Sequence, residues 1–195
     1  QIFKGFGLKY LMAQKIFETY NDCDRFPYHY YIWEGMDGSQ ITTYSPTNYS
    51  FKMTPEQNIE AWENRAQKDE LDTFLVPFGY GDGGGGATRD HLELALRQRD
   101  LEGAPRVKLA SPVQMFEDLE RAGGPVHKYV GELYLTMYLG MYTVQAQIKD
   151  KNRRSEFALR DAELLESLAS WVKGTVYPAA ALEQEWKNLL QNHFH

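Results

Sequence analysis

The chain has 195 residues, of which 43% are hydrophobic and 14% aromatic, and its formal charge is −6. This composition supplies a packed core and excludes a disordered chain. The charge is mild and forms no basic stripe, so nucleic acid is a poor partner. No apolar run approaches the ~18 residues of a membrane span. The single cysteine, Cys23, excludes an internal disulfide framework and favours a reducing, cytoplasmic compartment.

The first third of the chain alternates between strand-like and helix-like patterns. β-Formers and aromatic residues predict strands over residues 9–13, 29–34 and 40–44. Thr54 is a good helix cap, since Pro55 suits the first turn and Gln57 completes a capping box. A helix is therefore expected from residue 55.

The next segments repeat the same order of strand, loop and helix. The apolar run in residues 72–78 predicts a strand buried on both faces. It leads through a glycine-rich loop to a helix that begins near Thr88. Residues 106–110 read as another strand, and Ser111 begins a further helix. This order predicts an α/β fold with a parallel sheet or barrel.

The pattern changes near residue 130, and we place a domain boundary there, with one domain at 1–128 and a second at 129–195. From about Thr143 the chain is strongly helical, and two apolar stripes at helical spacing predict helices of a small bundle. The chain starts without a methionine and stops directly after a helical pattern. We therefore expect it to be an internal piece of a longer protein.

The most unusual stretch is the glycine-rich loop at residues 79–86, where Asp82 is the only ionisable side chain besides the phenol of Tyr80. The loop follows a predicted strand and precedes a predicted helix, where α/β folds place active sites. Four consecutive glycines suit a backbone that must approach a ligand or move. A flexible connector is the simpler alternative. The spacing G-x-G-x-x-G also occurs here, but a glycine-dense run satisfies it by chance, and Asp82 would repel a pyrophosphate.

Two other positions can carry chemistry. Asp37 follows an aromatic strand, although Asp-Gly is also a common hairpin turn and composition alone favours the turn. The terminal His195 can reach a metal ion, although a lone terminal histidine usually has no such role.

These segments, taken in order, resemble glycoside hydrolase family 38, the α-mannosidases. The resemblance rests on Trp-Glu-Gly-Met-Asp-Gly-Ser at 33–39, Gly-Asp-Gly-Gly-Gly-Gly at 81–86, Gly-Glu-Leu-Tyr-Leu at 131–135 and Asn-His-Phe-His at 192–195. It covers nearly the whole chain. It implies the late part of a catalytic α/β barrel domain, followed by the start of a three-helix-bundle middle domain.

The resemblance also implies a function and a site. The family cleaves terminal α-mannosidic bonds with retention, using a divalent metal and two aspartates. Asp82 matches the acid/base carboxylate, Asp37 and Lys15 match substrate contacts, and Tyr80 is a further candidate from its place in the loop. His195 matches one ligand of a metal ion, most simply zinc. The nucleophilic aspartate and the other ligands would precede Gln1, so this piece alone is expected to be inactive.

The expected partner is an α-mannoside oligosaccharide or glycan. The sequence leaves open whether the full-length enzyme forms a homo-oligomer. Two other readings remain. One is a carbohydrate-binding relative of the same fold without catalysis. The other is an α/β nucleotide-binding protein that uses the glycine-rich loop.

Overall fold

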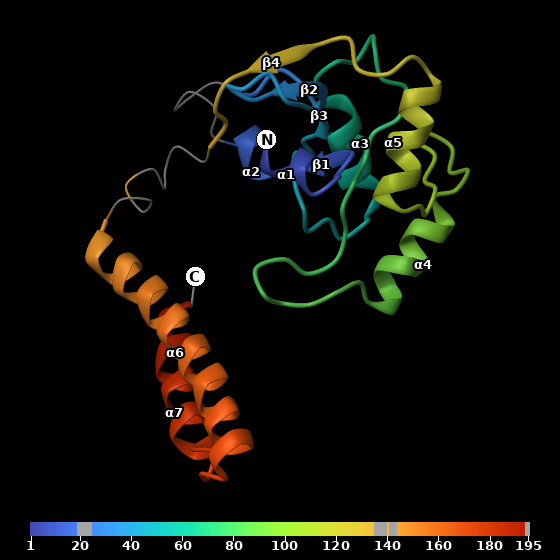
Figure 1. Ribbon diagram of the computed structural model, residues 1–195. Helices are drawn as coiled ribbons and strands as arrows, with labels where there is room; N and C mark the ends of the chain where they lie inside the picture. Colours follow the sequence, from blue (N-terminus) through green and yellow to red (C-terminus); the bar gives the residue numbers. More distant parts are fainter. Residues whose placement is uncertain (19–24, 135–139, 141–143, 194–195) are drawn as a thin grey trace. The chain divides into compact units, whose positions relative to one another are not determined.

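The computed structural model describes residues 1–18, 25–134, 140 and 144–193 (Figure 1). The chain divides into two compact units, Gln1–Leu139 and Gly140–His195. The boundary expected after residue 128 stays a prediction. In the first unit the elements are α1 (Ile2–Gly5), β1 (Tyr10–Met12), α2 (Lys15–Glu18), β2 (Tyr30–Glu34), β3 (Gln40–Tyr44), α3 (Pro55–Glu63), α4 (Arg89–Arg97), α5 (Pro112–Arg121) and β4 (Lys128–Val130). In the second unit they are α6 (Ala146–Lys173), α7 (Ala179–Leu190) and a 3-10 turn (Gln191–His193).

The strands of the first unit form one four-stranded sheet in the order β1-β3-β2-β4. β1 runs parallel to β3 and β4 runs parallel to β2, whereas β2 and β3 form an antiparallel hairpin. The strands predicted near residues 9–13, 29–34 and 40–44 are confirmed, and so is the mixed α/β class. The sheet is mixed, where a parallel sheet was expected. Closure into a barrel stays a prediction.

The strands predicted at residues 72–78 and 106–110 are not formed. The first segment makes one isolated bridge, between Phe78 and Phe51. The N–H of Leu75 instead donates to the hydroxyl oxygen of Tyr44 at 3.0 Å. Phe74, Val76 and Phe78 still pack against a buried cluster. The prediction of a strand buried on both faces is therefore wrong: residues 74–78 are half-buried, Asp72 and Thr73 are exposed, and no neighbouring strand pairs with the segment.

Three helices begin where their capping residues predicted, with N-caps at Thr54, Thr88 and Ser111. The capping box is complete at Thr88, whose N–H donates to Nδ1 of the His91 ring at 3.1 Å. Gln57, expected to close a box on Thr54, accepts from the N–H of Lys52 instead, at 2.9 Å. The cap of α3 therefore depends on the threonine side chain and on the proline in the first turn.

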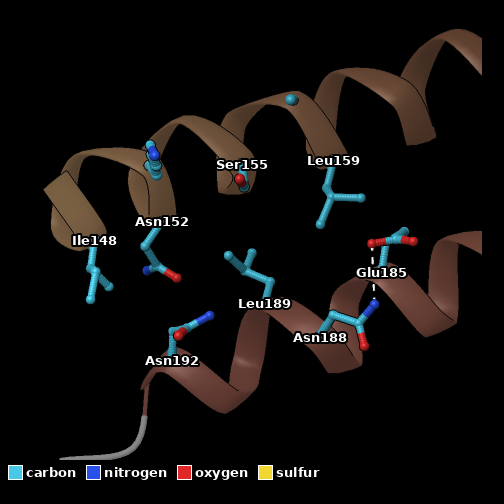
Figure 2. A pocket seen from close by; sticks show the side chains of 10 residues that line it. Ile148, Asn152, Ser155, Leu159, Glu185, Asn188, Leu189 and Asn192 are labelled. Carbon is cyan, nitrogen blue, oxygen red and sulfur yellow. Dashed lines mark hydrogen bonds between the residues drawn. The ribbon is translucent and has the colours of Figure 1, made fainter.

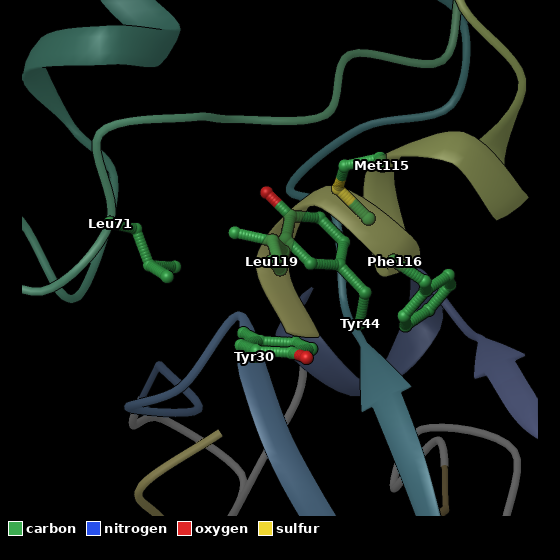
Figure 3. Packing of buried hydrophobic residues seen from close by; sticks show 6 residues of the cluster. All are labelled: Tyr30, Tyr44, Leu71, Met115, Phe116 and Leu119. Carbon is green, nitrogen blue, oxygen red and sulfur yellow. The ribbon is translucent and has the colours of Figure 1, made fainter. Parts of the chain in front are cut away.

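A cluster of aromatic and aliphatic side chains packs α5 against β2 and β3 (Figure 3). Tyr30 and Tyr44 come from the two strands of the hairpin, and Phe116 comes from the helix. Tyr10 of β1 extends the cluster, because its ring stacks on Phe116 with 4.6 Å between centroids. Tyr30 starts β2 and lies opposite Tyr44 at the end of β3, whereas Tyr10 starts β1 and lies opposite Thr42, so this packing joins α5 to three strands of the sheet. The full cluster is Tyr30, Tyr44, Leu71, Met115, Phe116 and Leu119.

On the edge of β2 that faces β4, the side chain of Gln67 bonds the start of the strand, before the pairing with β4 begins at Ile32. Oε1 of Gln67 accepts from the N–H of His29 at 2.7 Å and from that of Tyr30 at 2.9 Å. Its Nε2 donates to the carbonyl of Tyr30 at 3.1 Å. The amide of Gln67 therefore mimics a strand's backbone. Its own backbone has a φ of 54°.

We expect Gln67→Asn to open the start of β2, because the shorter amide keeps the left-handed backbone but does not reach the strand. Two partly buried donors would lose their acceptor, which costs about 3 kcal/mol of local stability. Hydrogen exchange at the His29 and Tyr30 amides measures this change. Gln184→Asn on the exposed face of α7 is the matched control, and unchanged protection of β2 would refute the role of Gln67.

In the second unit, α6 and α7 are joined by a short turn that begins at Gly174, whose φ of 70° suits glycine at a helix end. Nε1 of Trp186 donates to Glu163 at 2.9 Å and ties α7 to α6. These two helices confirm the helical character predicted from about residue 143. Within the described part of the chain, no helix combines the length and apolarity that crossing a membrane demands.

Candidate active site

The glycine-rich loop contains a tight turn with Asp82 near its tip. The N–H of Gly84 donates to the carbonyl of Gly81 at 3.0 Å. The two central residues, Asp82 and Gly83, have φ values of 51° and 77°. Positive φ at both positions is the signature of a type I′ turn, and Asp-Gly is one of its preferred pairs. The loop therefore presents an exposed carboxylate on a defined backbone.

The carboxylate is held by a tyrosine from another segment. Oη of Tyr49 donates to Oδ1 of Asp82 at 2.5 Å. The ring reaches this position because residue 81 is a glycine: a Cβ there would lie 2.4 Å from Cε2 of Tyr49. No real side chain tolerates that distance to an aromatic ring. The absence of a Cβ at Gly81 thus allows the Tyr49 ring to lie close to the backbone.

Tyr49 lies in the segment that follows β3, and its backbone is fixed by the preceding residue. Oδ1 of Asn48 accepts from the N–H of Tyr49 at 2.7 Å and from the N–H of Ser50 at 2.9 Å. The segment is also tied to the residues after β1, because Nε2 of Gln14 donates to the carbonyl of Thr47 at 3.1 Å. These bonds set the direction in which the tyrosine leaves the sheet.

Lys15 reaches the same tyrosine from the start of α2. Its Nζ donates to Oη of Tyr49 at 3.3 Å and lies 4.7 Å from the centre of the ring. β1 and β3 are parallel neighbours with Met12 opposite Tyr44, so the segments that follow them leave the sheet at the same end. Two residues singled out in the sequence, Lys15 and Asp82, are therefore brought together through Tyr49.

Tyr80 lies in the same loop and is exposed. Its ring meets the buried ring of His91 edge-on, with 5.2 Å between centroids. An isolated bridge between Tyr80 and Gly85 closes the base of the turn. The exposed Tyr80 thus lies two residues before Asp82 in the same loop.

Asp37 lies elsewhere. It belongs to the turn between β2 and β3, and this turn is at the start of β3, whereas Tyr49 follows its end. The Oγ and N–H of Ser39 donate to the Asp37 carboxylate at 2.8 and 3.1 Å. These bonds hold the pKa of Asp37 below its usual value. The structure therefore gives Asp37 the hairpin-turn role that composition favoured. It does not bring Asp37 together with Asp82, and a sugar contact there stays a prediction.

His195 lies outside the described residues, so its role as a metal ligand stays a prediction. Among the residues that the structure describes, no group of three or more His, Cys, Asp or Glu side chains could hold a metal ion. The described part of the chain therefore does not form a metal centre by itself.

A separate cavity of about 520 Å³ lies between α6 and α7 (Figure 2). Asn152, Asn188 and Asn192 give it a polar lining, and Leu159 and Leu189 supply apolar surface. Asn192 belongs to the motif at 192–195, but Lys15, Asp37, Tyr80 and Asp82 do not line this cavity. The candidate active site is therefore the cluster formed by Lys15, Tyr49 and Asp82 in the first unit.

A carboxylate that is held by a tyrosine beside an ammonium group is suited to moving protons, as acid/base enzymes do. Comparisons with known proteins agree with this class. Residues 1–132 match the glycosyl hydrolases family 38 N-terminal domain, and residues 136–195 match the alpha mannosidase middle domain. The chain belongs to glycosyl hydrolase family 38.

Curated relatives align with the whole chain. It is 40% identical to alpha-mannosidase 2C1 of Mus musculus and 39% identical to alpha-mannosidase 2C1 of Homo sapiens, over all of its residues in both cases. It is 31% identical to alpha-mannosidase G of Dictyostelium discoideum. The chain spans 18–19% of the length of these relatives.

Proposed function

We propose that the protein to which this chain belongs is a retaining α-mannosidase, and that Asp82 is its acid/base carboxylate. The arrangement of Lys15, Tyr49 and Asp82 carries this proposal, since it presents an exposed carboxylate in a fixed position within the chain's most unusual loop. Family membership supports it, and the matched relatives are named alpha-mannosidases. The substrate would be a terminal α-mannoside of an oligosaccharide or glycan.

Retaining hydrolysis requires two carboxyl groups. In the first step the nucleophile, an aspartate that we place outside this chain, attacks the anomeric carbon while Asp82 gives its proton to the departing glycosidic oxygen. In the second step Asp82 accepts a proton from water, and that water breaks the glycosyl–enzyme bond. Asp82 suits both steps, because its exposed side chain leaves room for a leaving group and then for a water molecule.

The neighbours of Asp82 suggest how the sugar is held. The ammonium group of Lys15 can donate to sugar hydroxyls beside the scissile bond, since it carries three donors. The exposed ring of Tyr80 offers an apolar face for a sugar ring and a hydroxyl for its edge. Asp37 is not a neighbour of Asp82, and its contact with a sugar hydroxyl remains a separate proposal from the resemblance.

A divalent metal, most simply zinc, completes the proposal. From the family resemblance we infer that His195 is one ligand and that the others precede Gln1, since the described residues form no such site by themselves. We expect His195→Ala in the full-length protein to lower the zinc content, as measured by elemental mass spectrometry, because one of about four ligands is lost. The half-buried His127 supplies the control variant. Full zinc content in His195→Ala would exclude this ligand.

Asp82→Asn in the full-length protein tests the proposed function, because Asn-Gly also suits a type I′ turn while the amide can act neither as an acid nor as a base. We expect turnover of an alkyl α-mannoside to fall by at least about 100-fold, the lower end of what general acid catalysis contributes. Asp90→Asn, on the exposed first turn of α4, should retain activity. A wild-type protein that binds α-mannosides without cleaving them would indicate the non-catalytic relative instead.

A further inference from the structure

Tyr49 was not singled out in the sequence, yet it makes the closest polar contact to the proposed acid/base group. We propose that Tyr49 is a positioning residue, which fixes the Asp82 carboxylate for proton transfer, and that Gly81 is a glycine because the tyrosine ring must lie against it. This inference rests on the proposed function of Asp82. It adds a residue from a different segment to the machinery of the same site.

The direction of the hydrogen bonds supports this role. The ammonium group of Lys15 only donates, so Oη of Tyr49 accepts from it at 3.3 Å. The single proton of the hydroxyl is then left for Oδ1 of Asp82, at 2.5 Å. A bond to a charged acceptor is stronger and shorter than one between neutral groups. With Oδ1 engaged in this way, we assign the transferable proton to Oδ2.

An exposed aspartate on a turn needs such a partner. The backbone of Asp82 is fixed by the turn, but its side chain would otherwise rotate among several rotamers in solvent. Proton transfer requires the carboxyl oxygen within hydrogen-bond distance of the leaving oxygen, and a small misplacement is costly. One bond from a tyrosine that is itself anchored through Asn48 removes that freedom.

The space around Gly81 is the second observation that supports the positioning role of Tyr49. A Cβ at this position would lie 2.4 Å and 2.9 Å from two atoms of the Tyr49 ring and 3.2 Å from Cβ of Ser50. An alanine there must displace the ring and with it the hydroxyl. At Gly86 in the same loop, a Cβ would meet nothing within 4 Å. The two glycines therefore differ in what they permit, although they lie in one run.

The test compares two α-mannosides in the full-length protein, one with an alkyl leaving group and one with 2,4-dinitrophenolate. The alkyl group needs a proton to depart, whereas dinitrophenolate does not. We expect Tyr49→Phe to lower kcat/KM for the alkyl substrate by about 30-fold and for the aryl substrate by less than about 3-fold, within the range of positioning effects. Gly81→Ala should produce the same split while retaining the hydroxyl.

Two matched controls make the same kinds of substitution at other positions. Tyr10→Phe deletes another tyrosine bond to a carboxylate, that to Glu120 at 2.8 Å, and Gly86→Ala adds a Cβ in the same loop. Both should leave the two rates unchanged. An equal loss on both substrates in Tyr49→Phe, or no loss on either, would overturn the positioning role. If Asp82→Asn still loses activity on the alkyl substrate in that case, the proposed function stands; if it does not, both fall.

Discussion

Asp82→Gly is expected to abolish useful hydrolysis of alkyl α-mannosides by the full-length protein, with kcat/KM reduced by about 1,000-fold or more. Glycine is the informative replacement, because the φ of 51° at this position disfavours alanine. With 2,4-dinitrophenyl α-mannoside the first step needs no acid and should proceed. The glycosyl–enzyme then accumulates, since no base activates water.

Added azide should restore turnover of the dinitrophenyl substrate by the Asp82→Gly protein. Azide is a nucleophile without a proton to lose, and the space left by the carboxylate admits it. The product would be α-mannosyl azide, because two inversions at the anomeric carbon retain its configuration. Asp90→Gly is a poor comparison within a helix, so Asp90→Asn serves as the control. If azide has no effect on the Asp82→Gly protein, and if the substitution slows hydrolysis of both substrates equally, Asp82 is not the acid/base residue.

The second large effect is a loss of local stability at mildly acidic pH, caused by His29. Its ring is fully buried, with Nδ1 donating to the carbonyl of Ser45 at 2.6 Å and Nε2 accepting from the N–H of Ala66 at 3.0 Å. Both nitrogens are thus used in the neutral form. Burial lowers the pKa of His29 to about 4, and the nearby Arg65 charge acts in the same direction.

The sign of the pH effect follows from the two pKa values. Above about pH 6.5 both the folded and the opened states hold a neutral ring. Between pH 6.5 and 4 the opened state binds a proton that the folded state excludes, so stability is lost as the pH falls. The loss is on the order of 3 kcal/mol at pH 4, at ~1.4 kcal/mol for each unit. Hydrogen exchange of the β2 and β3 amides at pH 7 and pH 4.5 measures it.

A variant without the titrating ring provides the comparison. His29→Gln should be less stable than the wild type at pH 7, since it loses part of the bonding to Ser45 and Ala66. Its opening free energy should nevertheless depend less on pH. His193→Gln, which removes an exposed ring in the second unit, should keep the wild-type pH dependence of β2 and β3. A wild-type protein whose β2 protection is equal at both pH values would contradict this account of His29.

Local signals in the sequence predicted much of the first unit. The threonine and serine caps located the starts of three helices, because a side-chain acceptor for the first turn is needed at those positions. β-Formers located β2 and β3. Asp-Gly is also a preferred pair for a type I′ turn, and the structure forms this turn at Asp82-Gly83. From the sequence, the glycine run suggested a backbone suited to close approach or movement.

Non-local pairing was not predictable in the same way. The apolar run at 72–78 suggested a fully buried strand, yet the segment is only half-buried at residues 74–78. Whether such a run becomes a strand depends on which groups meet its N–H and carbonyl groups. In this protein Tyr44 takes the N–H of Leu75 through its side chain. The Asp37-Gly38 turn signal did indicate the hairpin of β2 and β3, whereas the order of strand, loop and helix elsewhere suggested a parallel sheet.

In the candidate site, too, the residues with local signals could be predicted and the residue placed by non-local pairing could not. Lys15, Tyr80 and Asp82 were singled out from the resemblance and the glycine-rich loop, whereas Tyr49 is one of 13 tyrosines and nothing local distinguishes it. Its importance arises from the parallel pairing of β1 with β3, which brings Lys15 to it, and from the missing Cβ of Gly81. A search for aromatic residues just beyond the ends of paired parallel strands would have raised it as a candidate.

The most direct test of the account is a crystal structure of the full-length protein with a non-hydrolysable α-mannoside bound. The account predicts that one oxygen of the Asp82 carboxylate lies within about 2.6–3.2 Å of the atom that links the sugar to its leaving group. The other oxygen should still accept from Tyr49. A mannoside bound with its linking atom turned away from Asp82, and with another carboxyl group in that position, would contradict it.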